Sequence, residues 1–284
     1  MKLDYTWEAI ESRRDRIHRR APELAVRTKK QALKFINKVG FCFLFQAENS
    51  ELPCLWNAVC GMRDAVPPKR KVRDPFQSLM SDLKRILPGG RGVFYGKVLQ
   101  GRPSVISLDL LPYFFALSHR VGKRDEYLSE FLHGRLTPIA KEIMDSLLDS
   151  SPQDTKGLKL AVVGTSRHRN LSFEKALGEL QSNMFIVNVA DEYDPFASEW
   201  EPVHRSFNQQ LKKVRHISVD EARTQILGKY FENQVVSSVQ AIHRVFGWKK
   251  QIIYKALGAL IQRGIIVPNV KVDGKDSIFY AHIG

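Results

Sequence analysis

Two adjacent lysines near the C-terminus, Lys249 and Lys250, have the chemistry and the placement of phosphate contacts. They begin a stretch in which Ile253 and Leu257 mark an apolar face at helical spacing, and Lys255 follows near its polar side. Ammonium groups on the polar side of a helix can pair with phosphate oxygens. The pattern therefore predicts a helix that binds a polyanion.

The sequence around these lysines predicts a complete winged-helix module over residues 218–284. Gly264 suits a left-handed cap at the end of the third helix, and Asp273-Gly274-Lys275-Asp276 is a strong hairpin signal. In this layout the third helix enters the major groove of DNA, and the wing, with Lys275 at its tip, reaches the backbone. A winged helix used only for protein contacts is the alternative. Three helices and then two strands are expected at 218–233, 238–246, 248–263, 265–272 and 277–283.

Residues 135–192 repeat this plan, which suggests a duplicated winged helix. Asp154 and Ser172 are the expected N-caps of its second and third helices. Between those helices, a loop with Arg167, His168 and Arg169 could reach phosphates or base edges, or could be a solvated polar turn. The helices are expected at 137–148, 154–163 and 173–181, the strand at 184–189, and an irregular connector at 191–217.

The N-terminal half of the sequence contains several arginines, and shorter helices and strands are predicted there. The first helix carries Arg13 and Arg16 as candidate DNA contacts, and the Pro-led linker 67–73 carries Lys69, Arg70 and Lys71, which either contact DNA or form a solvated connector. Helices are expected at 5–20, 23–39, 52–60 and 76–87, a buried strand at 41–45, a hairpin at 93–99 and 104–110, and an aromatic segment at 111–118. The sequence therefore predicts four modules. They are a degenerate winged helix at 1–66, a linker, helix and hairpin region at 67–134, a second winged helix at 135–200, and the C-terminal winged helix at 201–284.

The charge supports a polyanion partner. The chain has 44 Lys and Arg against 30 Asp and Glu, a net charge of +14. The excess lies in three blocks, 1–38, 63–102 and 201–284, whereas 103–200 is net acidic. Blocks of this kind folded onto one face would form a basic groove, where released counterions supply much of the affinity for DNA.

Several other classes of protein are not expected. Cys42, Cys54 and Cys60 form no C-x-x-C pair and are best explained as small buried hydrophobes in a reducing cytoplasm. No Ser/His/Asp triad, phosphate-binding glycine loop or metal-ligand spacing is present. No apolar run is long enough to span a bilayer, and no signal peptide is evident. The sequence thus predicts a monomer without cofactors, without membrane contact, and associated with the nucleoid.

Three stretches carry a family resemblance: Asn37-Lys38-Val39-Gly40-Phe41-Cys42-Phe43-Leu44-Phe45, Tyr95-Gly96-Lys97-Val98-Leu99, and Ser107-Leu108-Asp109-Leu110-Leu111-Pro112-Tyr113. They resemble the AlkZ/YcaQ superfamily of bacterial DNA glycosylases, and most of all its AlkZ-related proteins. The resemblance implies a mostly helical α+β fold, with tandem winged helices around a basic concave channel for double-stranded DNA. It also implies excision of alkylated or modified bases, as part of DNA repair and without a metal.

The catalytic motif of the family is not matched. The glycosylases carry Gln-x-Gln or Gln-x-Asp soon after the glycine of this stretch, and those positions fall on Phe43 and Phe45. Excision passes through an oxocarbenium-like sugar, which an amide or carboxylate must stabilise while water is positioned. Phenylalanine offers no acceptor, so the two rings, with Tyr113, are candidates for a base pocket instead.

Three outcomes follow for the chemistry. The chain could be a non-catalytic DNA binder, such as a damage sensor or a transcriptional regulator. It could be a monofunctional DNA glycosylase that uses Gln46, Glu48 or Glu51, which come soon after the apolar run. It could instead use Asp109 beside the aromatic cluster, although Asp109 could equally be the N-cap of the next helix.

Overall fold

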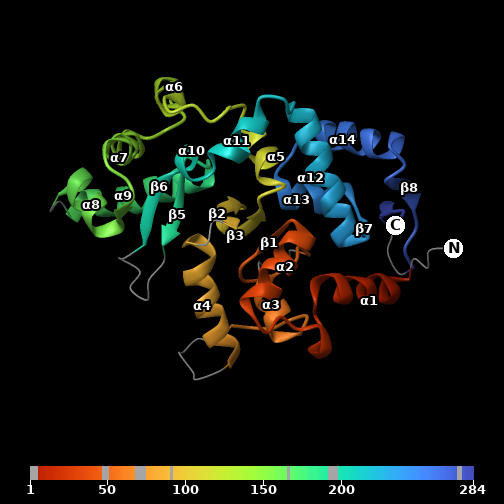
Figure 1. Cartoon of the computed structure of the whole chain (residues 1–284). Coiled ribbons are helices and arrows are strands. Elements are labelled where there is room, and N and C mark those ends of the chain that lie inside the picture. Colours follow the sequence, from red (N-terminus) through yellow and green to blue (C-terminus); the bar gives the residue numbers. More distant parts are fainter. Residues whose placement is uncertain are drawn as a thin grey trace. The chain divides into compact units, whose positions relative to one another are not determined.

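The computed structural model describes residues 6–46, 51–67, 75–89, 92–164, 167–190, 198–273 and 277–284. The chain is mostly helical with small antiparallel sheets, which confirms the predicted α+β class (Figure 1). It divides into two compact units. The first joins residues 1–80 to residues 218–284, and the second comprises residues 81–217.

The C-terminal module of the first unit follows the predicted order of helices and adds a short strand. Ser218 and Ser238 cap its first two helices by accepting hydrogen bonds from Glu221 N and Ala241 N. Gly247 ends the second helix in the left-handed conformation, with φ of 68°. The elements are α12 (Val219–Gln234), β7 (Val236–Ser237), α13 (Val239–Phe246), α14 (Lys250–Gln262), β8 (Ile266–Val270) and β9 (Phe279–His282), and the sheet order is β7-β9-β8.

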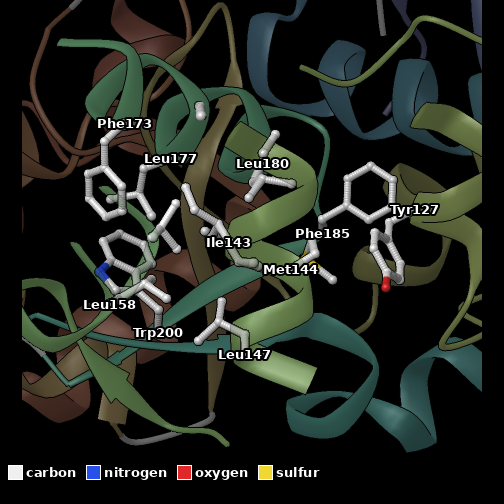
Figure 2. Packing of buried hydrophobic residues seen from close by; sticks show 14 of the residues in the cluster. Tyr127, Ile143, Met144, Leu147, Leu158, Phe173, Leu177, Leu180, Phe185 and Trp200 are labelled. Atoms are coloured by element: carbon white, nitrogen blue, oxygen red, sulfur yellow. The ribbon is translucent and has the colours of Figure 1, made fainter. Parts of the chain in front are cut away.

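The second unit contains the same order of elements, so the predicted internal repeat is present in the secondary structure. Thr137 and Asp154 cap its helices, as Asp154 was expected to do. Its core gathers Ile143, Leu180 and Trp200 from helices and sheet, as Figure 2 shows. The elements are α7 (Pro138–Asp149), β4 (Gln153–Asp154), α8 (Thr155–Val163), α9 (Arg167–Ser182), β5 (Ile186–Ala190) and β6 (Glu199–Pro202), with sheet order β4-β6-β5.

The N-terminal segment packs on the C-terminal module, which explains why they form one unit. Ile10 of the first helix lies in an apolar cluster with Val235, Val236 and Ala281 around the C-terminal sheet. Phe41 meets Phe246 edge to face, with ring centroids 6.1 Å apart. The N-terminal elements are α1 (Trp7–His18), a 3-10 turn η1 (Pro22–Leu24), α2 (Lys29–Val39), β1 (Phe41–Phe43) and α3 (Leu55–Cys60).

The rest of the second unit is a hairpin and short helices. Gln100 and Gly101 form the hairpin tip with φ of 53° and 66°, left-handed values that suit a tight turn. The elements are α4 (Pro75–Gly89), which begins in the first unit, β2 (Val93–Leu99), β3 (Arg102–Ser107), α5 (Leu111–Ala116), α6 (Glu126–Leu132), α10 (Val203–Ser206) and α11 (Asn208–Val214).

Three predicted segments were wrong. The helix predicted over 23–39 starts only at Lys29, because Thr28 is the N-cap and accepts a hydrogen bond from Gln31 N. Residues 167–170, predicted as a loop, form the first turn of α9, so Ser172 lies inside a helix and caps nothing. The connector predicted over 191–217 contains β6, α10 and α11, held by buried Trp200 and Leu211.

Candidate nucleic-acid interface

Helix α14 presents Lys249 and Lys250 at its N-terminal end. Lys249 is the N-cap residue of α14 and Lys250 is its first residue, and both are exposed. Ile253 and Leu257 bury the opposite face of the helix. Neither lysine forms an ion pair with a residue that the structure describes. Two adjacent ammonium groups are therefore available to an anionic partner.

A groove of about 370 Å³ lies beside Lys250, within the C-terminal module. Tyr254, one turn after Lys250, is 54% exposed, and Ile278 on the hairpin side is 63% exposed. Burial raises the pKa of Tyr280, so its hydroxyl stays protonated and can donate a hydrogen bond. The groove combines a cation, amides, hydroxyls and ring faces, a set that suits a sugar-phosphate backbone. Its polar lining includes Ser238, Gln240, Lys250, Tyr254, Asn269, Ser277 and Tyr280.

Lys255 lies on a different side of α14 and already has a partner. Its Nζ is 2.6 Å from Oδ2 of Asp220, in the first turn of α12. The hydrogen bond from Lys255 holds the pKa of Asp220 below its usual range. Arg263 pairs in the same way with Glu221. Both pairs are solvent-exposed and therefore weak, but a DNA contact by Lys255 would compete with one of them.

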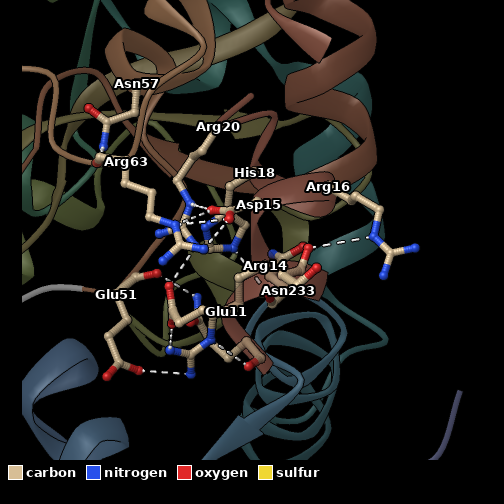
Figure 3. A network of polar contacts seen from close by, with 12 residues as sticks. Glu11, Arg14, Asp15, Arg16, His18, Arg20, Glu51, Asn57, Arg63 and Asn233 are labelled. Carbon is tan, nitrogen blue, oxygen red and sulfur yellow. Dashed lines mark hydrogen bonds and ion pairs between the residues drawn. The ribbon is translucent and has the colours of Figure 1, made fainter. Parts of the chain in front are cut away.

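The arginines of α1 are mostly used inside the first unit (Figure 3). Arg14 is only 2% exposed, and it donates hydrogen bonds to the carbonyl oxygens of Gln234 and Val236, both at 2.8 Å. Arg13 donates to the Gly284 carbonyl at 2.6 Å. Arg16 is exposed and points away from the network in Figure 3, so it is the α1 arginine best placed for an outside partner.

Glu51 and Gln46, two candidate catalytic residues, both have protein partners. Glu51 Oε2 accepts a hydrogen bond from Arg14 Nη2 at 3.1 Å, while Gln46 Oε1 accepts one from Asn57 Nδ2 at 3.0 Å. The amide oxygen of Gln46 has two acceptor lone pairs, and the bond from Asn57 uses one of them. Glu51 is 40% exposed and keeps a second carboxylate oxygen. Its catalytic role remains a prediction.

Asp109 differs from these two residues. It is exposed in the turn between β3 and α5, and it has no partner among the described residues. The N-cap residue of α5 is Leu110, and no side chain accepts a capping hydrogen bond there. The alternative of Asp109 as a helix cap was therefore wrong. Tyr113, on the first turn of α5, is half-buried, whereas Phe114 and Phe115 are buried in the core.

The two phenylalanines that replace the family's polar pair have different surroundings. Phe43 is 1% exposed, and its backbone N donates to the Pro53 carbonyl at 3.0 Å. Phe45 is half-buried, with its ring centroid 6.1 Å from that of Trp56. Of the two rings, only that of Phe45 is partly accessible. A base-pocket role for Phe43, Phe45 and Tyr113 remains a prediction.

Comparison with known proteins decides the family. A family model described as AlkZ related matches residues 26–247. The chain belongs to the AlkZ-related family. The solved structure of the Streptomyces sahachiroi DNA glycosylase AlkZ matches it with a TM-score of 0.58 at 12% identity, over 99% of this chain and 71% of that one. At this identity the likeness shows the AlkZ fold alone. A search of curated proteins found no match.

Some predicted contacts of this AlkZ-related chain lie outside the described residues. They are Glu48, Lys69, Arg70, Lys71 and Lys275, together with the side chains of Arg167, His168 and Arg169. Within the described ranges no group of three metal-ligating side chains occurs, and no helix is long and apolar enough to cross a membrane.

Sequence reasoning missed two features of the AlkZ-related interface. Tyr254 and Gln240 line the groove, and a signal existed for Tyr254, because it follows Lys250 by one helical turn. Asn57, which orients Gln46, gave no signal, because its buried position depends on how the chain folds around α3.

His18 of α1 should make the first unit sensitive to acid. Its Nε2 lies 3.0 Å from the Asn233 carbonyl, so Nε2 carries the hydrogen that is donated. Burial, and then the charges of Arg20 and Arg14, lower its pKa well below 6.5. The folded state thus binds fewer protons than the unfolded state, and stability should fall as the pH drops through about 6.5, by at most about 1.4 kcal/mol per pH unit.

Urea unfolding at pH 7.5 and 5.5 tests this. His18→Gln, which can still donate to the carbonyl, should lose less stability between the two pH values than the wild type. The exposed His216→Gln should behave as the wild type does. Equal pH dependence in all three proteins would contradict the role given to His18.

Proposed function

We propose that this chain binds double-stranded DNA and recognises a damaged or modified base, as a DNA-repair protein related to the glycosylases. The observation that carries the proposal is the free pair Lys249 and Lys250 at the start of α14, beside a groove lined by hydroxyls, amides and tyrosine rings. Membership of the AlkZ-related family, the AlkZ fold and a net charge of +14 support it.

Two winged-helix modules would supply the DNA contacts. Residues 138–202 and 219–282 share the order helix, strand, helix, helix and hairpin, and the same strand order in their sheets. In such modules the helix before the hairpin faces the duplex, and here that helix is α9 or α14. We assign residues 135–200 and 201–284 to these modules, and 1–66 to a degenerate third module.

Base excision is the second candidate function, and the exposed carboxylate of Asp109 favours it. Asp109 is the candidate acid that no described residue engages, and half-buried Tyr113 follows one turn later. In this role the carboxylate would stabilise the cationic sugar and position the attacking water, while the ring would stack on the extruded base.

A base-excision assay separates the two candidate functions. The protein is incubated with duplexes carrying N3- or N7-alkylated purines or an interstrand crosslink, and alkali then cuts any abasic site. Base excision predicts strand scission by the wild type and a loss of about 10²–10³ in rate for Asp109→Asn. Asp149→Asn, an exposed acid of the same unit, should retain full activity.

Other outcomes assign the function differently. Scission that survives in Asp109→Asn but is lost in Glu51→Gln would move the chemistry to Glu51. No scission on any substrate, alongside salt-sensitive DNA binding, would leave a non-catalytic DNA binder, such as a damage sensor or a transcriptional regulator.

A further inference from the structure

The second unit carries a cluster of exposed basic side chains at the end of α11, the short helix labelled in Figure 1. Leu211 and Val214 are each 3% exposed and anchor this helix in the unit. Their spacing leaves Lys212 and Lys213 facing outward, and Arg215 and His216 continue the exposed surface after the helix ends. None of the four forms an ion pair with a described residue.

The loop before α6 brings two more basic residues, Lys123 and Arg124, close to α11. Gly122 has φ of 82°, and a Cβ on it would lie 2.8 Å from Leu211 Cδ1, so the loop backbone lies directly against α11. Lys123 and Arg124 follow this contact, and both are exposed without an ion pair among the described residues. Lys123 and Arg124 line one small pocket together with His204 of α10, the helix that precedes α11.

Together these residues form what we call the α11 patch: Lys123, Arg124, Lys212, Lys213, Arg215 and His216. The nearest carboxylate in sequence on one side, Glu126, is already occupied, because its two oxygens accept hydrogen bonds from Val121 N and Gly122 N. The exposed Asp125 is the acid that remains beside the patch. These hydrogen bonds leave the charge of Glu126 in place, so the five Lys and Arg charges of the patch stand against the two carboxylates of Asp125 and Glu126.

The helix dipole explains only part of this arrangement. Cations near a helix C-terminus are stabilised by the helix dipole, which accounts for Lys212 and Lys213. It does not account for Lys123 and Arg124, which approach α11 from another segment. Crowding like charges costs free energy unless a partner neutralises them.

The chemistry of the patch fits a polyanion better than a protein surface. Stable protein interfaces centre on buried apolar or aromatic anchors. None of the exposed large apolar side chains in the described part of the chain belongs to the patch. Closely spaced Lys and Arg without an anchor are typical of contacts with successive phosphates.

We propose that the α11 patch binds the phosphate backbone of DNA, as a contact separate from helix α14. The inference rests on the proposed function, since it names a second surface for the same ligand. It extends the interface to a helix that lies outside both repeated sets of helix, strand, helix, helix and hairpin.

The test measures how DNA affinity depends on salt. Fluorescence anisotropy with a labelled duplex, between 50 and 200 mM NaCl, compares the wild type with Lys212→Gln/Lys213→Gln and with Lys123→Gln/Arg124→Gln. Each lost phosphate contact should reduce the slope of log K against log salt by about 1, so each double variant should lose roughly 1–2 from its slope. The control is Lys29→Gln/Lys30→Gln, two adjacent, exposed and unpaired lysines at the start of α2.

The outcomes separate this inference from the proposed function. A reduced slope in both patch variants, with the control unchanged, supports the patch. An unchanged slope in the patch variants, or an equal reduction in the control, overturns it even if the wild type binds DNA. A wild type that does not bind DNA at any salt overturns the proposed function first, and the patch with it.

Discussion

Arg14→Ala is expected to destabilise the first unit by about 3–5 kcal/mol, the usual cost of removing one partner from a buried ionic network. The guanidinium holds two backbone carbonyls and two carboxylates: Gln234 O, Val236 O, Glu11 and Glu51. Alanine would leave the carbonyl oxygens buried without donors, and it would remove the charge that Glu11 and Glu51 face. The effect is large because Arg14 joins α1 to the C-terminal module across 220 residues of sequence.

Urea unfolding followed by tryptophan fluorescence measures this loss. Trp7, Trp56 and Trp248 lie in the first unit and only Trp200 in the second, so the signal reports mainly on the first. Arg16→Ala, an exposed arginine of the same helix, should change stability by less than about 0.5 kcal/mol. Equal stability of the two variants would show that Arg14 is not the residue that holds α1 in place.

Replacing Lys249 and Lys250 with glutamine should weaken DNA binding about thirtyfold at low salt, if each phosphate contact is worth about 1 kcal/mol. Both lysines are exposed, so the protein should remain as stable as the wild type. The loss should be similar for all DNA sequences, because phosphates carry no base identity. The salt slope should also fall by about 2.

Anisotropy titrations of the variant and the wild type measure these changes. Lys29→Gln/Lys30→Gln is the matched control, because it also removes two adjacent lysines at the start of a helix in the same unit. Lys255→Gln should have a smaller effect, since its charge already pairs with Asp220. Unchanged affinity in Lys249→Gln/Lys250→Gln would remove α14 from the interface.

Local signals predicted most of the C-terminal module. Ser218 and Ser238 were predicted as the first residues of two helices and are the N-caps of those helices, and the apolar spacing of α14 identified its buried face. Capping and periodicity act within a few residues, so a sequence shows them directly. Residues 191–217 lacked such a period, because α10 and α11 are too short to show one.

The roles of individual charged residues could not be predicted from the sequence. Arg13, Arg14 and Arg16 lie on one basic helix and look alike in the sequence. In the structure Arg14 is buried, Arg13 binds the carbonyl of Gly284, and Arg16 is exposed. The two backbone carbonyls that Arg14 binds, those of Gln234 and Val236, lie more than 200 residues away, and no spacing rule connects them to Arg14. Lys255 forms an ion pair and Lys250 does not, and the sequence could not show this difference. Only the folded chain places Asp220 beside Lys255.

The affinity of the wild-type protein for duplex DNA, measured from 50 to 200 mM NaCl, tests the central claim most directly. We expect binding that weakens steeply with salt, by about 10³-fold or more if six or more phosphates are neutralised. Absence of binding at 50 mM NaCl, or an affinity that does not change with salt, would contradict the conclusion that this AlkZ-related protein is a DNA-binding protein.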